Sequence, residues 1–136
     1  MDYTVRIGIH TSIAGALENA ALRAAELGAN TFQIFSISPR SWSFDNVDPA
    51  AAQALRRTRE KLDLRPLVVH DNYLINLAAA DETIRRKSMA AFRAEIERAV
   101  AIGADYLVMH PGSSKNQTVE QALDVLSTSL AEAAKG

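Results

Sequence analysis

Short apolar runs alternate with amphipathic stretches four times along this chain, and this alternation restricts the fold more than any other feature. The runs lie near residues 5–10, 31–35, 67–70 and 106–110. Strands that are apolar on both faces and separated by helices are typical of a parallel sheet covered by helices. We therefore predict an α/β fold of four βα units, with parallel strands in sequential order and right-handed helical crossovers. Four such units fit either a small open sheet or half of an eight-stranded barrel, and periodicity alone does not choose between them.

Capping residues predict a helix after each apolar run. A Ser, Asp or Thr able to cap a helix N-terminus precedes each amphipathic stretch, and Gly28 and Gly103 stand where two of the helices should end. The predicted helices begin at Ser12, Asp48, Asp81 and Thr118, and Gln121 completes a capping box in the last of them. Helical spacing predicts that the third helix turns four apolar residues inward, namely Ile84, Phe92, Ile96 and Val100. The last helix carries Val119, Leu123, Leu126 and Leu130.

The composition excludes several classes of protein. Fifteen Lys and Arg residues oppose sixteen Asp and Glu residues, so any contact with nucleic acid must come from a local patch rather than from net charge. The absence of Cys excludes disulfides and thiolate metal ligands. No apolar run approaches the ~20 residues needed to span a bilayer, and the N-terminal MDYTVRIGIH has no apolar signal core. We expect a cytoplasmic protein that makes no membrane contact.

All three histidines of the chain directly follow predicted strands. His10, His70 and His110 stand at the ends of the first, third and fourth apolar runs. The carboxyl ends of parallel strands converge on one edge of the sheet, where functional sites of such folds lie. Neutral imidazoles are good ligands for Zn²⁺, so this placement predicts a metal site. The alternative is that each imidazole only forms a hydrogen bond with loop backbone at the rim of the sheet.

Longer motifs around these histidines carry a resemblance to a known family. His70 opens HDNYLINLA and His110 opens HPGS, while IGIHTSIAGALENAALRAAELGANTFQIF and SPRSW lie upstream. In this order and spacing, from about Arg6 to Ser113, the segments resemble the endonuclease IV family of metal-dependent apurinic/apyrimidinic endonucleases. The resemblance covers the N-terminal half of that family only, so it implies one half of a TIM (β/α)8 barrel.

The resemblance implies a zinc site at the mouth of the barrel. The family carries a three-zinc cluster there and hydrolyses DNA 5′ to abasic sites in base excision repair. His70 and His110 match two histidines that bind the most exposed zinc. His10 matches a histidine that lines the mouth, and we expect it at most to support the ligands. The other ligands belong to the family's second half, so we expect a partial site for Zn²⁺ or another divalent metal, with no certain catalytic residue.

The resemblance also implies contacts with abasic-site DNA. Arg40 matches a loop arginine that enters the DNA at the lesion, and its planar guanidinium suits phosphate. Tyr73 and Leu74 match a pair that wedges into the minor-groove side, where apolar side chains offset lost base stacking. Alternatively, Leu74 belongs to a core segment behind the third strand. Trp42, close to Arg40, is expected to anchor its loop by packing.

Two other functions stay open at this point. A xylose isomerase-like sugar isomerase or epimerase would share the architecture, although it does not need the Arg40 loop or the Tyr73–Leu74 wedge. We expect residues 1–136 to form a single half-barrel domain of four βα units. In the non-catalytic alternative, this half-barrel would be stable only by pairing with another copy. We expect such a unit to form a homodimer through its exposed sheet edges, or to pair with the missing second half-barrel. Its inner face is expected to carry Ile7, Ile9, Ile34, Val69 and Val108.

Overall fold

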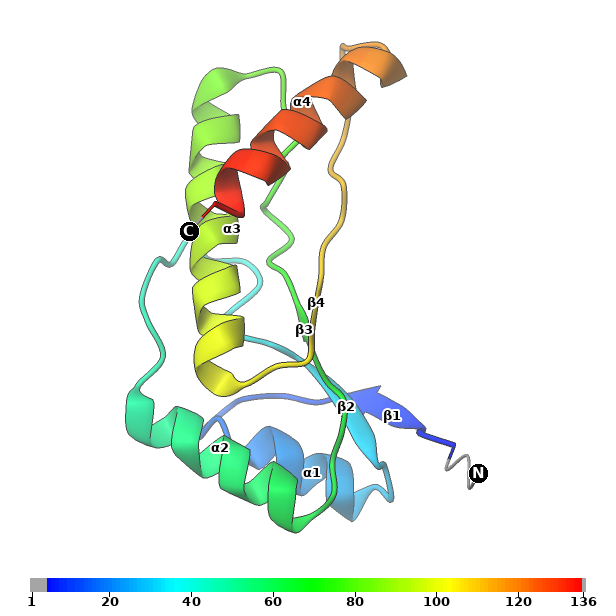
Figure 1. The fold of residues 1–136 in the computed structure, drawn as a ribbon, viewed down its shortest axis with the longest axis vertical. Coiled ribbons are helices and arrows are strands. Elements are labelled where there is room, and N and C mark those ends of the chain that lie inside the picture. The colour runs from blue at the N-terminus through cyan, green and yellow to red at the C-terminus, as the bar shows by residue number, and fades with distance from the viewer. Residues whose placement is uncertain (1–4, 136) are drawn as a thin grey trace.

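Four parallel strands alternate with four helices within residues 5–135, which are the part of the chain that the computed structural model describes. The strands pair in the order β1-β2-β3-β4, and every pairing is parallel (Figure 1). The predicted α/β fold of four βα units is therefore confirmed. In chain order the elements are β1 Gly8–His10, α1 Asn19–Glu26, β2 Thr31–Phe35, α2 Pro49–Lys61, β3 Leu67–His70, α3 Glu82–Ile102, β4 Tyr106–Val108 and α4 Val119–Ala133.

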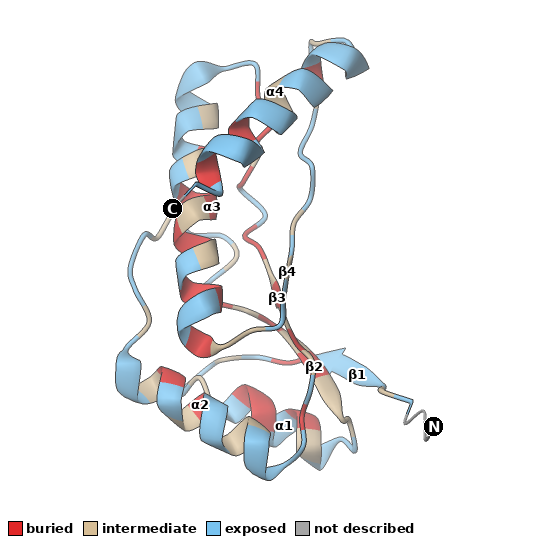
Figure 2. Ribbon diagram, viewed as in Figure 1, coloured by how far each residue is buried: buried red, intermediate tan, exposed pale blue. Residues whose placement is uncertain are grey.

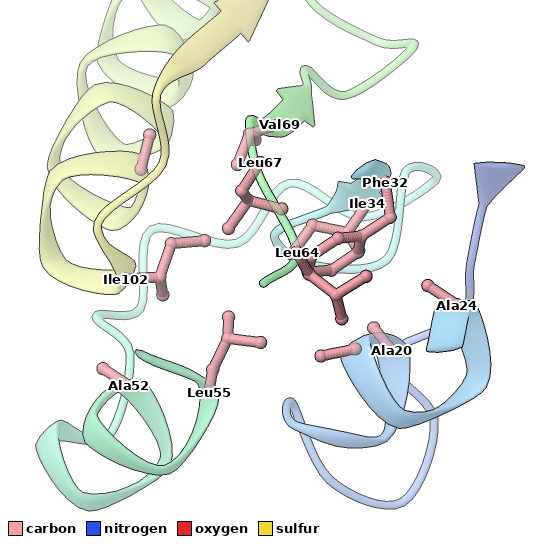
Figure 3. Packing of buried hydrophobic residues seen from close by; sticks show 12 residues of the cluster. Ala20, Ala24, Phe32, Ile34, Ala52, Leu55, Leu64, Leu67, Val69 and Ile102 are labelled. Atoms are coloured by element: carbon pink, nitrogen blue, oxygen red, sulfur yellow. The ribbon is translucent and has the colours of Figure 1, made fainter. Parts of the chain in front are cut away.

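The sheet buries one face under helices. Ile34 of β2 pairs with Val69 of β3, and both side chains are fully buried in a cluster with apolar residues of α1, α2 and the end of α3 (Figure 3). Because side chains alternate between faces along a strand, the next register pair, Phe35 and His70, lies on the opposite face. The prediction that Ile34 and Val69 line an inner barrel face is therefore wrong. Successive side chains of a strand point to opposite faces, so an assignment that is off by one residue places every side chain on the wrong face.

The opposite face of the sheet is less covered, and we call it the open face. Ile9 was predicted to lie on it but pairs with Phe32, a core residue, and stays exposed at the edge strand β1. Ile7 precedes β1 and is also exposed. Val108 pairs with His70, so the prediction is confirmed for Val108 alone. Two register rows lie on the open face. One contains His10, Gln33, Val68 and Tyr106, and the other contains Phe35, His70 and Val108.

The caps of the last three helices are as predicted. The Asp48 carboxylate accepts a hydrogen bond from the Ala51 amide at the start of α2, and Thr118 and Gln121 form the capping box of α4. Asp81 caps α3 in the same way, and Gly103 ends that helix with a φ of 73°. The left-handed conformation at Gly103 lets the chain turn directly into β4, because glycine has no Cβ to clash there.

The first helix begins later than predicted. It starts at Asn19, whereas the sequence predicted a cap at Ser12. The Ser12 hydroxyl instead accepts a hydrogen bond from the Ala14 amide in a loop. Gly15 follows with a φ of 83°, which is incompatible with a right-handed helix. The loop between β1 and α1 is therefore longer than expected, and it borders the carboxyl end of the sheet.

Helix α3 buries polar side chains that its apolar pattern did not predict. Glu95 and Arg98 are each 1% exposed, and Ser88 is fully buried. Of the four apolar residues predicted to face the core, Phe92 is buried and Ile96 is partly buried. Ile84 and Val100 are exposed. The prediction is wrong for the two exposed residues: Val100 points away from the face that buries Glu95 and Arg98, whereas Ile84 shares that face but lies in the first turn of α3.

Helix α4 packs on α3, and Figure 2 shows buried positions along α4. Its buried residues are Ala122, Ser129 and Ala133. The four larger apolar residues of this helix are largely exposed, with Leu126 partly buried and Val119, Leu123 and Leu130 exposed. Small residues allow a close approach of two helix backbones, which turns the larger side chains of α4 toward solvent. Within residues 5–135 no helix is long and apolar enough to cross a membrane.

Candidate metal and nucleic-acid site

The three histidines gather at the carboxyl edge of the sheet. His10 and His70 are the last residues of β1 and β3, and His110 follows the end of β4. The Nε2 atoms of His70 and His110 lie 3.2 Å apart, so the structure brings this pair together as predicted. His10 is not part of the pair. The ring of Phe35 contacts both His10 and His70, with ring centroids 4.5 and 5.4 Å away.

Hydrogen bonds define how His70 presents its ring. Its Nδ1 lies 2.8 Å from the Asp71 carbonyl oxygen, which can only accept, so Nδ1 carries the proton and Nε2 keeps a lone pair. The His110 Nε2 then donates to that lone pair. A metal shared by the two rings would need His110 in its other neutral tautomer, with the proton on Nδ1, so that both Nε2 atoms present lone pairs.

The donor pair fits a zinc ion. Two nitrogens that bind a tetrahedral zinc at about 2.0–2.1 Å stand roughly 3.3 Å apart, and the observed separation is 3.2 Å. Both donors are imidazole nitrogens, which this metal accepts. Among residues 5–135 no group of three or more His, Cys, Asp or Glu side chains is placed to hold a metal ion. The pair therefore supplies two ligands of an incomplete site.

Two residues of β2 complete the surroundings of the histidines and were missed by sequence reasoning. Phe35 lies between the imidazoles and also contacts Tyr73 edge-on, with ring centroids 5.2 Å apart. Gln33 places its amide nitrogen 2.9 Å from the Nδ1 of His10. The sequence feature that could have identified them is the alternation of side chains along a strand, which puts Gln33 and Phe35 on the same face as the histidines at the strand ends. Burial and the nearby His70 lower the pKa of His10, so its ring is neutral at pH 7.

A buried carboxyl group lies directly behind the histidine pair. Asp71 is 1% exposed, and neither of its carboxyl oxygens has a hydrogen-bond partner within the described chain. Burial raises its pKa from 3.8 to about 7, and Glu95 adds to this rise, while the neighbouring His70 and the backbone amide of His110 oppose it. A carboxyl group in this state is protonated over much of the range in which aspartates are ordinarily ionised.

Asn76 ties the loop after β3 to the loop after His110. Its Oδ1 accepts hydrogen bonds from the amides of Ser113 and Ala78, each 3.1 Å away, and its Nδ2 donates to the Ser113 carbonyl. Gly112 has a φ of 98°, and a Cβ there would lie 2.0 Å from the Asn76 Oδ1. The glycine thus permits the close approach that holds the HPGS loop against the segment following His70.

The residues expected to contact DNA lie together at the surface beside this edge. Arg40 is exposed, Tyr73 is 60% exposed and Leu74 is 36% exposed, whereas Ile75 and Leu77 are buried. The alternative interpretation, in which Leu74 belongs to a core segment behind the third strand, is therefore wrong. The Tyr73 amide donates to the Pro39 carbonyl at 3.2 Å, which joins the Tyr73 segment to the Arg40 loop.

Trp42 anchors the Arg40 loop, as the packing interpretation predicted. It packs against the second apolar cluster, which includes Ile75 and Phe92, and the Lys87 ammonium lies 4.6 Å from its ring centroid. The Nδ2 of Asn72 adds a hydrogen bond to the Ser41 carbonyl. The loop is therefore held from the segment that follows β3 and from α3, and it carries the exposed Arg40.

Comparison with known proteins identifies the family. The sequence profile described as Xylose isomerase-like TIM barrel matches residues 21–135. "Probable endonuclease 4" from Solibacter usitatus is 52% identical over 97% of this chain and 46% of its own length. Endonuclease IV from Thermus thermophilus has a crystal structure with a TM-score of 0.82 and 37% identity, covering 97% of this chain and 48% of that one.

A more distant likeness shows the fold alone. D-psicose 3-epimerase from Clostridium cellulolyticum has a TM-score of 0.66 and 15% identity, covering 94% of this chain and 47% of that chain. The present chain thus spans about half the length of the relatives that it matches. The chain belongs to the endonuclease IV family of xylose isomerase-like TIM barrels, and its four βα units form part of such a barrel.

Proposed function

We propose that this chain supplies part of the metal site and of the DNA-contacting surface of a zinc-dependent apurinic/apyrimidinic endonuclease. Such an enzyme hydrolyses the phosphodiester 5′ to abasic sites in base excision repair. The main evidence for this proposal is the 3.2 Å separation of the His70 and His110 Nε2 atoms. The exposed Arg40, Tyr73 and Leu74 beside the pair support it. Likeness to the sugar epimerases extends only to the fold.

His70 and His110 would hold Zn²⁺, or another divalent metal, through their Nε2 atoms. When bound, the ion would supply Lewis acidity toward a phosphate oxygen and activate water. The contribution of this chain is orientation: the Asp71 carbonyl fixes the His70 ring, and Asn76 fixes the loop that follows His110. Neutral imidazoles leave the positive charge of the ion undiminished, which suits an anionic substrate.

Arg40, Tyr73 and Leu74 would bind the DNA around the lesion. The Arg40 guanidinium offers a planar set of donors to a phosphate or to the gap left by a missing base. Tyr73 and Leu74 present adjacent aromatic and aliphatic surfaces at the mouth, where they would stack against the bases next to an extruded nucleotide. His10 would support this mouth without binding the metal.

Residues 1–136 would act as one half-barrel domain with a partner that completes the site. The remaining ligands would come from a second copy of the chain in a homodimer, or from the second half-barrel of the family fold. Either partner would pair with the edge strands β1 and β4, which have no neighbour on their outer sides within residues 5–135.

Calorimetric titration with Zn²⁺ tests the metal pair. We expect weak binding to the wild-type chain and a loss of most of the heat in His70→Ala, because one of the two donors is removed. His10→Ala is the matched control, since it removes an imidazole at the same sheet edge but outside the pair. Equal heats for the wild type and His70→Ala would remove His70 from the site and overturn the proposal.

A further inference from the structure

His10 and Gln33 form a linked pair on neighbouring strands. They are register partners of β1 and β2, so their side chains share one face of the sheet. The amide nitrogen of Gln33 lies 2.9 Å from the Nδ1 of His10. An amide NH₂ group can only donate, so Nδ1 must be the acceptor in this contact.

This hydrogen bond fixes the position of the ring proton. A neutral imidazole carries one proton, and with Nδ1 acting as an acceptor the proton is on Nε2. The lowered pKa of His10 keeps the ring in this neutral form at pH 7. His70 has the opposite tautomer, because its Nδ1 donates to the Asp71 carbonyl and its Nε2 is left with a lone pair. At the same sheet edge, the Nε2 of His10 is therefore a hydrogen-bond donor, whereas the Nε2 of His70 offers a lone pair.

The position of His10 agrees with a role outside metal binding. Phe35 contacts both His10 and His70, and the direct Nε2 contact joins His70 to His110 only. His10 instead borders a hollow of about 540 Å³ that is lined mainly by Thr11, Ser12, Ile13, Phe35, Ile37 and Pro39. These side chains contain no carboxylate or imidazole that would complete a metal site around His10.

We propose that Gln33 is a positioning residue that locks His10 in the Nε2–H tautomer and thereby excludes it from the metal site. The inference deepens the proposed function, because it limits the histidine ligands of this chain to His70 and His110. Gln33 achieves this by occupying the one lone pair of the His10 ring. The ring then offers a hydrogen-bond donor at the mouth in place of a metal ligand.

Nitrogen-15 NMR of the histidine side chains tests the tautomer directly. In the metal-free wild-type chain at about pH 8, we expect the His10 Nδ1 to resonate as an unprotonated nitrogen and Nε2 as a protonated one. Gln33→Glu replaces the donor by an acceptor of the same length, so Nδ1 should become the protonated atom. Gln33→Met keeps the length without a polar atom, and there the Nδ1 signal should move toward that of a free lone pair.

The outcomes separate this inference from the proposed function. A protonated Nδ1 in the wild type, or an unchanged tautomer in folded Gln33→Glu, would overturn the role of Gln33. If Gln33→Glu does not fold, the wild-type spectrum still shows whether the His10 Nδ1 is protonated, and this result alone can overturn the proposal. Added Zn²⁺ should shift the signals of His70 and His110 and leave those of His10 unchanged; a matching His10 shift would overturn the exclusion. A Zn²⁺ titration that moves no histidine signal, with the tautomer as predicted, would count against the proposed function alone.

Discussion

Asp71 makes the stability of the chain depend on pH. Burial raises its pKa from 3.8 to about 7. At a pH between these two values, the Asp71 carboxyl group is therefore protonated in the folded chain and ionised in the unfolded chain. Between about pH 4 and pH 7 the folded state binds more protons than the unfolded state. The stabilisation that comes from this proton is complete below the unfolded pKa and is lost as the pH rises through the folded pKa.

We expect Asp71→Asn to remove this dependence and to be more stable than the wild type near pH 8. A pKa difference of one corresponds to about 1.4 kcal/mol, so the rise from 3.8 to about 7 sets an upper limit of roughly 4 kcal/mol on the gain. Urea unfolding of both proteins in EDTA, from about pH 4 to pH 8, measures it. Parallel pH profiles would show that Asp71 ionises as it does in the unfolded chain.

Asn76 provides a second prediction at the residue scale. Asn76→Ala removes the two hydrogen bonds with Ser113 that hold the HPGS loop, so the orientation of His110 should become less defined. We expect Zn²⁺ affinity to fall about tenfold, the lower end of what outer-shell changes cost in metal sites. Asn116→Ala is the control, because it truncates an exposed amide in the same loop. Equal affinities in the two variants would mean that Asn76 does not position His110.

Some of these residues could be predicted from the sequence and others could not. His70 and His110 each follow an apolar run, and the carboxyl ends of adjacent parallel strands must converge, so their pairing was predictable. Gln33 and Phe35 were missed because an apolar run does not reveal which of its two faces is covered by helices. The burial of Asp71 was hidden because it depends on packing against distant parts of the chain.

Helix α3 and the loop over residues 36–45 are linked by a buried ion pair. The Ser36 hydroxyl donates to the Glu95 carboxylate at 2.5 Å, and the Arg98 guanidinium donates to the Ser36 hydroxyl and to the Asp45 carbonyl. Arg98 and Glu95 also lie within 3.0 Å of each other. One pair of side chains on α3 thus holds both ends of the loop that carries Arg40.

We expect Arg98→Met to destabilise the chain by about 3–5 kcal/mol, because it leaves the Glu95 carboxylate buried without its cation. Arg86→Met is the matched control on α3; its exposed pair with Glu82 contributes roughly 0.5 kcal/mol or less. Urea unfolding measures both, and the fluorescence of Trp42, the only Trp in the chain, reports on the loop. Similar losses in the two variants would contradict the anchoring role of Arg98.

Helix positions were more predictable than helix faces. Asp48, Asp81 and Thr118 marked true starts because a cap depends on hydrogen bonds a few residues away. The start at Ser12 was wrong because Gly15 takes a left-handed conformation, which the sequence permits without requiring. The burial of Glu95 and Arg98 on α3 was missed because burial of a charge depends on a partner that local spacing does not reveal.

For the whole molecule, we expect the purified chain to be nearly inactive on abasic DNA. It offers two imidazole ligands, and within residues 5–135 no larger group of metal-binding side chains surrounds them. Hydrolysis by several metals needs a bridging carboxylate to organise the nucleophile. A nicking assay on an abasic duplex with added Zn²⁺ measures this, and a full-length endonuclease IV serves as the positive control. Efficient cleavage that EDTA abolishes would show that two ligands suffice.

The two edges of the sheet lead to the last prediction, which concerns association. β1 and β4 each pair on one side only within residues 5–135, and the open face exposes Tyr106 and Val108. Unpaired parallel edges and exposed apolar side chains are both unfavourable in water. Two copies related by a two-fold axis could join β1 of one to β4 of the other and close an eight-stranded ring.

We therefore expect the 136-residue chain to form dimers whose population rises with concentration. Val108→Lys should shift the equilibrium toward monomer, because it places a charge on the open face of β4, at the new junction. Val100→Lys is the control: Val100 is 69% exposed, and it lies on α3 and not on an edge strand. Light scattering at several concentrations measures the mass of each protein. A stable wild-type monomer at high concentration would show that the helices protect the sheet without a partner, and equal dimerisation in both variants would place the interface elsewhere.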